Sequence, residues 1–534
     1  MRRALLSVGV LLTLIFSLPA QDIYVPPFDE LHFHSPYEKS TLSKGRFPNL
    51  SDQLSLFLAS SNQNDSSTLV EVNQRVESLL QEISQKLNKK KSYKKQSKLL
   101  FNIVHNRLLK KYVEQATFEQ IFETGVFNCV TATALYVMVF EHFDIPYAIK
   151  LEPNHVFPII DPDGESIFVE TTDPRYGVTT FSDKDKRAFV NYLRETKLIS
   201  ETEAKSQSVQ ELFSQYYLGD NETINIRQLA GAQYYNNALY ALDVEDAQTA
   251  LAMIEKATYL HATPRNQLVV FSSLYQLVTA IDYSNKDSFR PLFKLLLHLP
   301  SEEVNLEVEQ QFGKLSEELL IERSSEKAFR DYYILFKEAV AADSSLSKTI
   351  DEIFHFQLSR FYVLSFRTRE ALEHAEKAYA LNPQNVRIRK LLTEVFLEQL
   401  RHIKDTKRSY EELNDFTQRH PFLERNPILI DFRLFCLSQL ASQYYDLEEE
   451  EKAEQYFELF NQRINNFEHS ANVDQYIATC YSNKSSYLFR EKKFKDARQW
   501  LEKGLVMLPN NEMLTRKLKA LEEYEEEFLS KGIE

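Results

Sequence analysis

The chain has 534 residues, which is too long for one ordinary hydrophobic core, so two or three domains are expected. It contains only ten glycines, and this scarcity favours helices over sheets because helices use glycine mainly at their ends. The formal charge of −14 at pH 7 argues against a nucleic-acid-binding protein, which usually has a basic face, and we expect no nucleic-acid partner.

Residues 1–20 predict a signal peptide. Arg2 and Arg3 precede an apolar run at 4–16, and residues 17–20 form a polar end with a small residue before the cleavage position. Leu18 fits the cleavage pattern poorly and leaves an uncleaved anchor as the alternative, although the apolar run is short for a membrane span. We therefore expect a protein secreted across the inner membrane to the bacterial periplasm or the cell exterior, without stable membrane insertion after cleavage.

Residues 21–88 are predicted to form an N-terminal segment that is partly extended and partly helical. Proline-containing pairs and a polar stretch at 60–67 favour an extended chain, with one helix near residues 50–59. Apolar residues recur at helical spacing from residue 68 to residue 87 and predict a longer helix there.

Residues 89–200 change in pattern and contain the only persuasive sheet of the chain. Gly125 interrupts a helical stretch, and a second helix is expected to start near Cys129 and run to residue 142. Three short β-prone segments follow, separated by turn sequences, at residues 147–151, 155–160 and 166–171.

A thiol, an imidazole and a carboxylate occur in order within this region. Cys129 begins the predicted helix, where the partial positive charge of the helix start favours a thiolate. His155 and Glu170 lie on consecutive predicted strands. These three groups are the nucleophile, the base and the orienting acid that thiol catalysis requires. Each also has an ordinary structural explanation, and only their joint order and context favour the catalytic one.

The predicted hairpin assigns the acid to Glu170. With a four-residue loop at 161–164, His155 faces Glu170 directly, and Asp173 has the opposite parity. Asp173 also precedes Pro174, which suits the end of a strand. A one-residue slip in register would turn Glu170 to the wrong face and leave Asp173 as the rival.

Together these motifs resemble the bacterial transglutaminase-like superfamily, which has a papain-like fold. The resemblance covers roughly residues 95–185 and rests on Gly125-x-x-Asn128-Cys129, Asp144-Ile145-Pro146, Asn154-His155-Val156-Phe157 and Glu170-Thr171-Thr172. It implies that Cys129 is the nucleophile, His155 the base and Glu170 the acid, although the family more often has aspartate at the last position. It leaves the reaction open, because members include cross-linking enzymes, cysteine peptidases and inactive copies.

Residues 225–534 follow a repetitive helical pattern. A small residue, an apolar residue four positions later and another three after that recur in seven series, which begin at Ala250, Ser288, Ala328, Ala371, Ser409, Ala453 and Ala497. The pattern resembles divergent tetratricopeptide repeats with a period longer than the usual ~34 residues. Residues 514–528 predict a final capping helix. Cys436 and Cys480 lie within the repeats and are expected to be free thiols.

These observations predict a mainly α-helical protein with an α+β papain/transglutaminase-like domain followed by an all-α helical-repeat solenoid. The leading function is a thiol-dependent amide hydrolase or acyl transferase, with hydrolysis favoured, whose repeats bind a protein or peptide. No phosphate-binding loop and no metal-ligand spacing occur in the sequence, so no cofactor and no metal are expected. The alternative is a non-catalytic protein-interaction scaffold with a degenerate transglutaminase-like domain.

Overall fold

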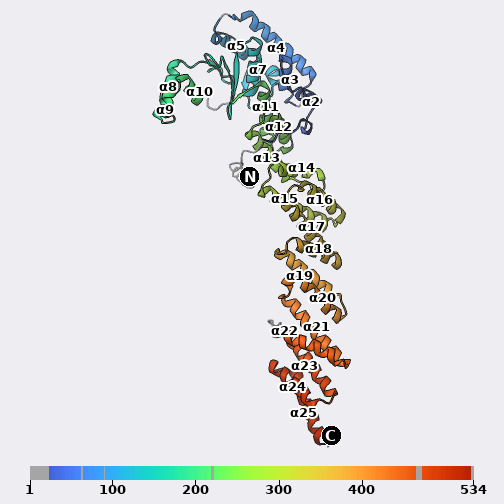
Figure 1. The fold of residues 1–534 in the computed structure, drawn as a ribbon. Helices are drawn as coiled ribbons and strands as arrows, with labels where there is room; N and C mark the ends of the chain where they lie inside the picture. Colours follow the sequence, from blue (N-terminus) through green and yellow to red (C-terminus); the bar gives the residue numbers. More distant parts are fainter. Residues whose placement is uncertain (1–22, 62–63, 90, 218–221, 465–471, 531–534) are drawn as a thin grey trace. The chain divides into compact units, whose positions relative to one another are not determined.

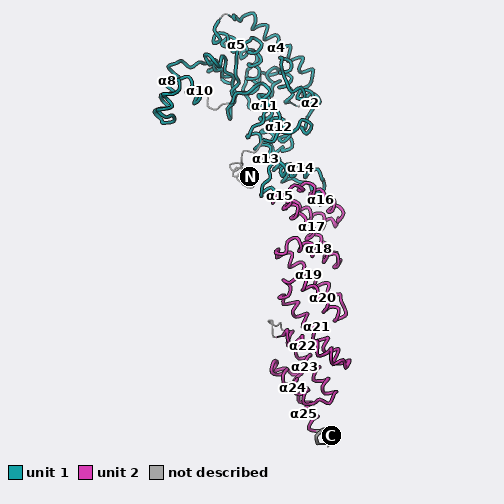
Figure 2. Tube along the Cα trace, viewed as in Figure 1, with its two compact units in different colours: residues 1–304 teal, residues 305–534 magenta. Residues whose placement is uncertain are grey.

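The computed structural model describes residues 23–61, 64–89, 91–217, 222–464 and 472–530. The predicted signal peptide at 1–20 lies outside the described residues. Helices dominate the described chain (Figure 1), which divides into two compact units, Met1–Val304 and Asn305–Glu534 (Figure 2). None of the helices in the described ranges is both long enough and apolar enough to span a bilayer.

The first unit begins with a short 3₁₀ turn and four helices. Their bounds are η1 (Phe28–Glu30), α2 (Pro36–Ser43), α3 (Leu50–Leu58), α4 (Ser66–Lys86) and α5 (Tyr93–Leu108). The helices expected at 50–59 and 68–87 are present, whereas α2 was not expected. Its signal is local, because Ser35 caps the helix through a hydrogen bond from the Glu38 N–H, and Pro36 occupies the first helical position.

A five-stranded antiparallel sheet follows, with the strand order β6-β5-β4-β3-β7. Its strands are β3 (Tyr147–Leu151), β4 (Val156–Ile160), β5 (Ile167–Val169), β6 (Val178–Thr179) and β7 (Glu222–Ile224). The three predicted β segments are its central strands, and β6 and β7 were not expected. A separate parallel pair joins β1 (Lys111–Tyr112) to β2 (Val126–Phe127), directly before Cys129.

The register of the β4–β5 hairpin differs from the predicted one by two residues. Ile159 pairs with Phe168 and Ile160 with Ile167, so the connection spans residues 161–166 rather than a four-residue loop. Asp161 and Ser166 both adopt a positive φ of 51°, and the Ser166 N–H closes the turn on the Asp161 carbonyl at 2.9 Å. A two-residue shift preserves strand parity, so His155 and Glu170 still share one face of the sheet.

Helix α7 (Cys129–His142) is the buried centre of this unit. Every residue from 130 to 140 is buried, and the helix packs against β4. Asn128 caps it by accepting a hydrogen bond from the Thr131 N–H, and the Thr131 hydroxyl accepts from the Asn128 N–H in return. The helix predicted just before it is reduced to one turn, α6 (Gln120–Glu123).

In the described chain, three helices lie between strands β6 and β7 of the sheet. They are α8 (Asp183–Glu195), α9 (Glu201–Ser206) and α10 (Val209–Tyr217). Val190, Leu193, Ile199 and Leu212 form a small separate core beneath them. Phe189, Ala204, Val209 and Tyr216 pack against this cluster, so the segment has an apolar core although its overall composition is polar.

Helical hairpins fill the described chain after residue 225, as the repeat pattern predicts. They pair α11 (Ile226–Asp243) with α12 (Ala247–Leu260), α13 (Pro264–Val278) with α14 (Arg290–His298), α15 (Glu302–Ser316) with α16 (Glu326–Ala339), α17 (Ser344–Leu364) with α18 (Thr368–Leu381), α19 (Val386–Arg401) with α20 (Thr406–Arg419), α21 (Pro427–Asp446) with α22 (Glu450–Ile464), and α23 (Val473–Arg490) with α24 (Phe494–Met507). Helix α25 (Glu512–Ser530) ends the array. Six of the seven small-apolar series begin on the second helix of a hairpin, whereas Ser288 lies in the 3₁₀ turn η2 (Lys286–Phe289) that precedes α14.

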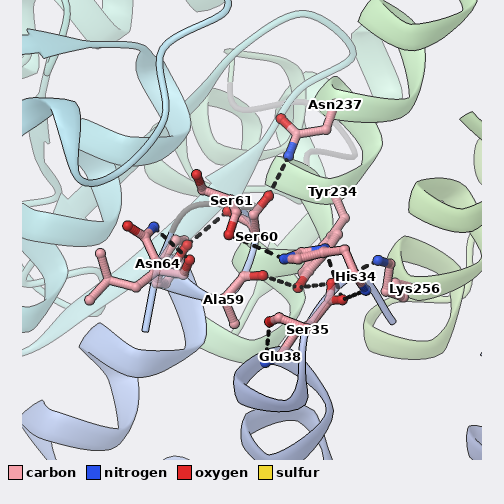
Figure 3. Close-up of polar contacts among 12 residues, drawn as sticks. His34, Ser35, Glu38, Ala59, Ser60, Ser61, Asn64, Tyr234, Asn237 and Lys256 are labelled. Atoms are coloured by element: carbon pink, nitrogen blue, oxygen red, sulfur yellow. Dashed lines mark hydrogen bonds and ion pairs between the residues drawn. The ribbon is translucent and has the colours of Figure 1, made fainter. Parts of the chain in front are cut away.

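A buried polar network holds the first hairpin to the N-terminal segment (Figure 3). The Glu38 carboxylate accepts hydrogen bonds from Tyr234 Oη at 2.9 Å and Lys256 Nζ at 2.7 Å. The side chains of Glu38 and Lys256 are 0% and 1% exposed. Hairpin α11–α12 thus belongs to the first compact unit, although its sequence follows the repeat pattern.

Candidate functional site

Cys129 is placed by the residue that precedes it. The Asn128 side chain is 1% exposed, and its Nδ2 donates to the Glu114 carbonyl at 3.1 Å and the Ala116 carbonyl at 2.9 Å. Its Oδ1 caps α7 at the same time. Cys129 is therefore held at the helix start with a half-buried thiol, beside the backbone N–H groups that a helix leaves unpaired at its first turn.

His155 and Glu170 are in contact at the edges of their strands. His155 Nε2 lies 3.1 Å from Glu170 Oε2, and both side chains are about a quarter exposed, at 27% and 29%. The other carboxylate oxygen of Glu170 accepts from the Thr172 N–H at 2.8 Å and from its hydroxyl at 2.5 Å. Thr172 thus fixes Glu170, and Glu170 fixes the His155 ring.

The electrostatics of this pair favour the charged forms. The neighbouring Cys129 thiol and the Glu170 carboxylate raise the pKa of His155 to about 10, against the opposing effect of burial. Burial disfavours the Glu170 carboxylate, but hydrogen bonds from His155 and Thr172 outweigh it and lower the pKa of Glu170 to about 2. Near neutral pH the imidazole is therefore protonated between a carboxylate and the thiol.

Asp173 is engaged elsewhere. Its carboxylate accepts from the Arg175 backbone N–H at 2.9 Å and from the Arg175 guanidinium Nε at 3.0 Å. These bonds close its own turn. Of the two candidate acids, Glu170 is the one that contacts His155.

Cys129 and His155 line one cavity of about 330 Å³. Tyr112 and Glu114 form part of its wall, and residues 151–156, which include the turn between β3 and β4, form another. The remaining wall comes from α11 and from Arg265 on α13. Sequence reasoning missed the contribution of α11, because its pattern is that of a repeat helix and no local signal marks a helix that closes a distant cavity.

The other two cysteines have no such environment. Cys436 on α21 and Cys480 on α23 are free and fully buried. Burial raises the pKa of Cys436 to about 12 and raises the pKa of Cys480 still further. Within the described ranges, no group of three or more His, Cys, Asp or Glu side chains is arranged to hold a metal ion.

No protein-family model matches the sequence, and no curated protein matches it either. Among solved structures, the TPR domain of P58(IPK) is 12% identical, covers 64% of this chain and 98% of its own, and has a TM-score of 0.19. The human IFIT1 dimer with PPP-AAAA is 11% identical, with coverages of 98% and 92% and a TM-score of 0.17. The APC/C hetero-tetramer Cut9-Hcn1 is also 11% identical, with coverages of 92% and 93% and a TM-score of 0.17. Superpositions this poor carry no argument, so the helical-repeat fold rests on the hairpins described above.

Proposed function

We propose that this protein is exported and combines thiol-dependent acyl chemistry with a helical-repeat array that binds a protein or peptide. The array supports the second part, because stacked hairpins present an extended surface suited to such partners. The first part is carried by one observation: Cys129 and His155 line the same cavity, and His155 is held by Glu170 at 3.1 Å.

The proposed reaction uses each group in a defined step. The Cys129 thiolate attacks the carbonyl carbon of an amide, and the N terminus of α7 provides backbone N–H groups for the oxyanion. Protonated His155 then gives its proton to the leaving amine as the C–N bond breaks, which leaves a thioester on Cys129. Water or a second amine attacks the thioester, transfers a proton back to His155 and releases the thiolate.

The resemblance to the transglutaminase-like superfamily supports the same three roles and the proposal of a papain-like domain at 89–200. Water as the acceptor makes the protein a hydrolase, and an amine makes it a cross-linking enzyme. Hydrolysis is the leading proposal. The Glu170 carboxylate replaces the aspartate that is commoner in the superfamily, and its extra methylene is accommodated because Glu170 follows the end of β5 and is held by Thr172.

In a direct test, the purified protein is incubated with peptides released from bacterial cell envelopes and with a labelled primary amine. The wild-type protein should generate new amino termini, or incorporate the label if it is a transferase, and Cys129→Ala should do neither. Cys436→Ala is the matched control, because it removes a buried thiol outside the cavity, and it should behave as wild type. Equal products from wild type and Cys129→Ala would overturn the proposal.

The acid can be tested with the same products. Glu170→Gln keeps the shape of the side chain but removes the charge that holds protonated His155, so turnover should fall by about a hundredfold. Asp173→Asn should stay within about twofold of wild type, because the hydrogen bonds that the structure gives to the Asp173 carboxylate all come from Arg175. Equal losses in both variants would remove Glu170 from its role.

A non-catalytic interaction scaffold is the second candidate, and the helical hairpins favour it directly. In that case the papain-like region serves recognition or structure only. The scaffold proposal predicts that Cys129→Ala changes neither partner binding nor any covalent product. A thioester trapped on Cys129 would exclude it.

A further inference from the structure

Helix α11 has two faces with different roles. One face lines the cavity above Cys129 and carries Ala232, Tyr235, Asn236, Leu239 and Tyr240. These positions recur at intervals of three and four residues, so they form a single stripe along the helix. A helix that the sequence assigns to the repeats therefore closes the cavity that contains the candidate nucleophile.

Tyr234 and Asn237 lie away from this stripe and Gln233 lies at its edge, and their polar contacts, several of which are drawn in Figure 3, fix α11 in place. Tyr234 Oη donates to Glu38 and, at 3.0 Å, to the Ala59 carbonyl. Asn237 Nδ2 donates to the Ser60 carbonyl at 3.0 Å, and Gln233 Nε2 donates to the Ala116 carbonyl at 3.3 Å. Hydrogen bonds between buried groups hold one geometry, because breaking any of them leaves a desolvated polar group without a partner.

The next hairpin holds the turn that precedes His155. Arg265 Nη1 on α13 donates to the Pro153 carbonyl at 2.7 Å, two residues before His155. The same guanidinium lies over the Tyr235 ring, 4.2 Å from its centroid. Arg265 thus links α11 to the turn that precedes His155, and this link holds the spacing between α11 and His155.

We infer that α11 is the substrate-selecting wall of the cavity, with Leu239 and Asn236 as specificity-determining residues. This inference rests on the proposed function. A volume of about 330 Å³ is near the lower end of ligand pockets and accommodates one side chain with its amide. The substrate class is therefore an extended peptide segment that inserts a single residue between α11 and the His155 turn, rather than the surface of a folded protein.

The inference can be tested without knowing the substrate, by comparing two thiol reagents on the full mature chain. Iodoacetamide is small, whereas an iodoacetamide that carries fluorescein must pass the α11 wall to reach Cys129. Leu239→Ala should raise the ratio of the bulky to the small alkylation rate by about tenfold, and Leu239→Phe should lower it. Leu242→Ala is the matched control, since Leu242 lies on the same helix but does not line the cavity, and its ratio should equal that of wild type.

The outcomes separate this inference from the proposed function. The inference about α11 is overturned if the ratio of the bulky to the small alkylation rate is unchanged in both Leu239 variants and their circular dichroism matches that of wild type. If a Leu239 variant fails to fold, Asn236→Phe replaces it, and a lower ratio supports the wall while an unchanged one overturns it. A Cys129 that reacts with iodoacetamide no faster than an ordinary thiol contradicts the proposed function, whatever the ratio shows.

Discussion

The two compact units contain hairpins of the same repeat pattern but use them differently. In the first unit, both helices of hairpin α11–α12 form buried contacts with Glu38, and α11 also lines the cavity of Cys129. In the second unit, Cys436 and Cys480 are simply packed within the helices. A repeat sequence therefore specifies how a hairpin folds, and the contacts of its outer faces decide what it does.

The polar residues buried in each unit make the same point. Lys484 in the second unit lies among aromatic rings, 4.0 Å from the centroid of Trp500, and pairs at 2.6 Å with Glu454, which is one third exposed. Glu38 and Lys256 in the first unit are both fully buried. Removing either Glu38 or Lys256 therefore leaves a fully buried charge without its partner, whereas in the Lys484–Glu454 pair only Lys484 is buried.

The largest expected effect is the difference between cysteines. Cys129 should react with iodoacetamide at least about a thousandfold faster than Cys436 or Cys480, because the last two become accessible only when helices open against the stability of the fold. Peptide mapping of partially labelled native protein by mass spectrometry measures all three rates in one sample. Comparable rates would mean that Cys129 is no more reactive than the buried cysteines of the repeats.

Removing the buried charge pair should be the next largest effect. Glu38→Gln leaves Lys256 without its anionic partner and should lower the free energy of unfolding of the first unit by about 3 kcal/mol. The control is Glu394→Gln, whose carboxylate lies 3.8 Å from Lys390 in an exposed pair and should change stability by less than about 0.5 kcal/mol. Urea unfolding of the full chain measures both, and a loss equal to that of the control would show that the network does not hold α11.

The stability difference between wild type and Glu38→Gln should depend on pH. Burial opposes ionisation of Glu38, but His34 and Lys256 outweigh it and lower its pKa below the ordinary value of 4.5. A lowered pKa gives stability that is present above the unfolded value and lost as the pH falls through the folded value. The stability difference between wild type and Glu38→Gln should thus be full at pH 7 and shrink below pH 4.5. A difference that grows on acidification would contradict the ion pair.

The smallest expected effect concerns Thr172, which donates hydrogen bonds to Glu170. Thr172→Val removes the hydroxyl that donates to Glu170 but keeps the backbone N–H that donates to the same oxygen. We expect a loss of about 1 kcal/mol in unfolding free energy and a lower pKa of His155, because Glu170 is held less firmly. NMR titration of the His155 ring measures the pKa. Thr258→Val, which removes a buried hydroxyl that donates to the Ile254 carbonyl within α12, is the control and should leave the His155 pKa unchanged.

Local patterns predicted much of this molecule. The start of α7 at Cys129, the three central strands and the second helix of six of the seven hairpins follow from capping residues, alternation and the spacing of small residues. The β4–β5 register was wrong by two residues, because Asp161 and Ser166 take left-handed conformations that lengthen the turn. The contact between His155 and Glu170 survived that error because parity was preserved.

Long-range packing could not be predicted in the same way. Strand β7 pairs with β3 from more than seventy residues away, and Tyr234 reaches Glu38 across almost two hundred. Neither partner has a sequence feature that points to the other. The role of α11 as a wall of the cavity belongs to this class, since it depends on which elements meet in space rather than on the composition of the helix.

The most direct test of the account is the pH dependence of Cys129 alkylation in wild type and in His155→Gln. The pKa of His155 is raised to about 10, so its positive charge persists beside Cys129 through neutral pH and is lost above pH 10. Wild type should therefore react about tenfold faster than His155→Gln at pH 6 to 7, and the two rates should converge above pH 10. Identical profiles that both rise near pH 8.5, as for an ordinary thiol, would contradict the account.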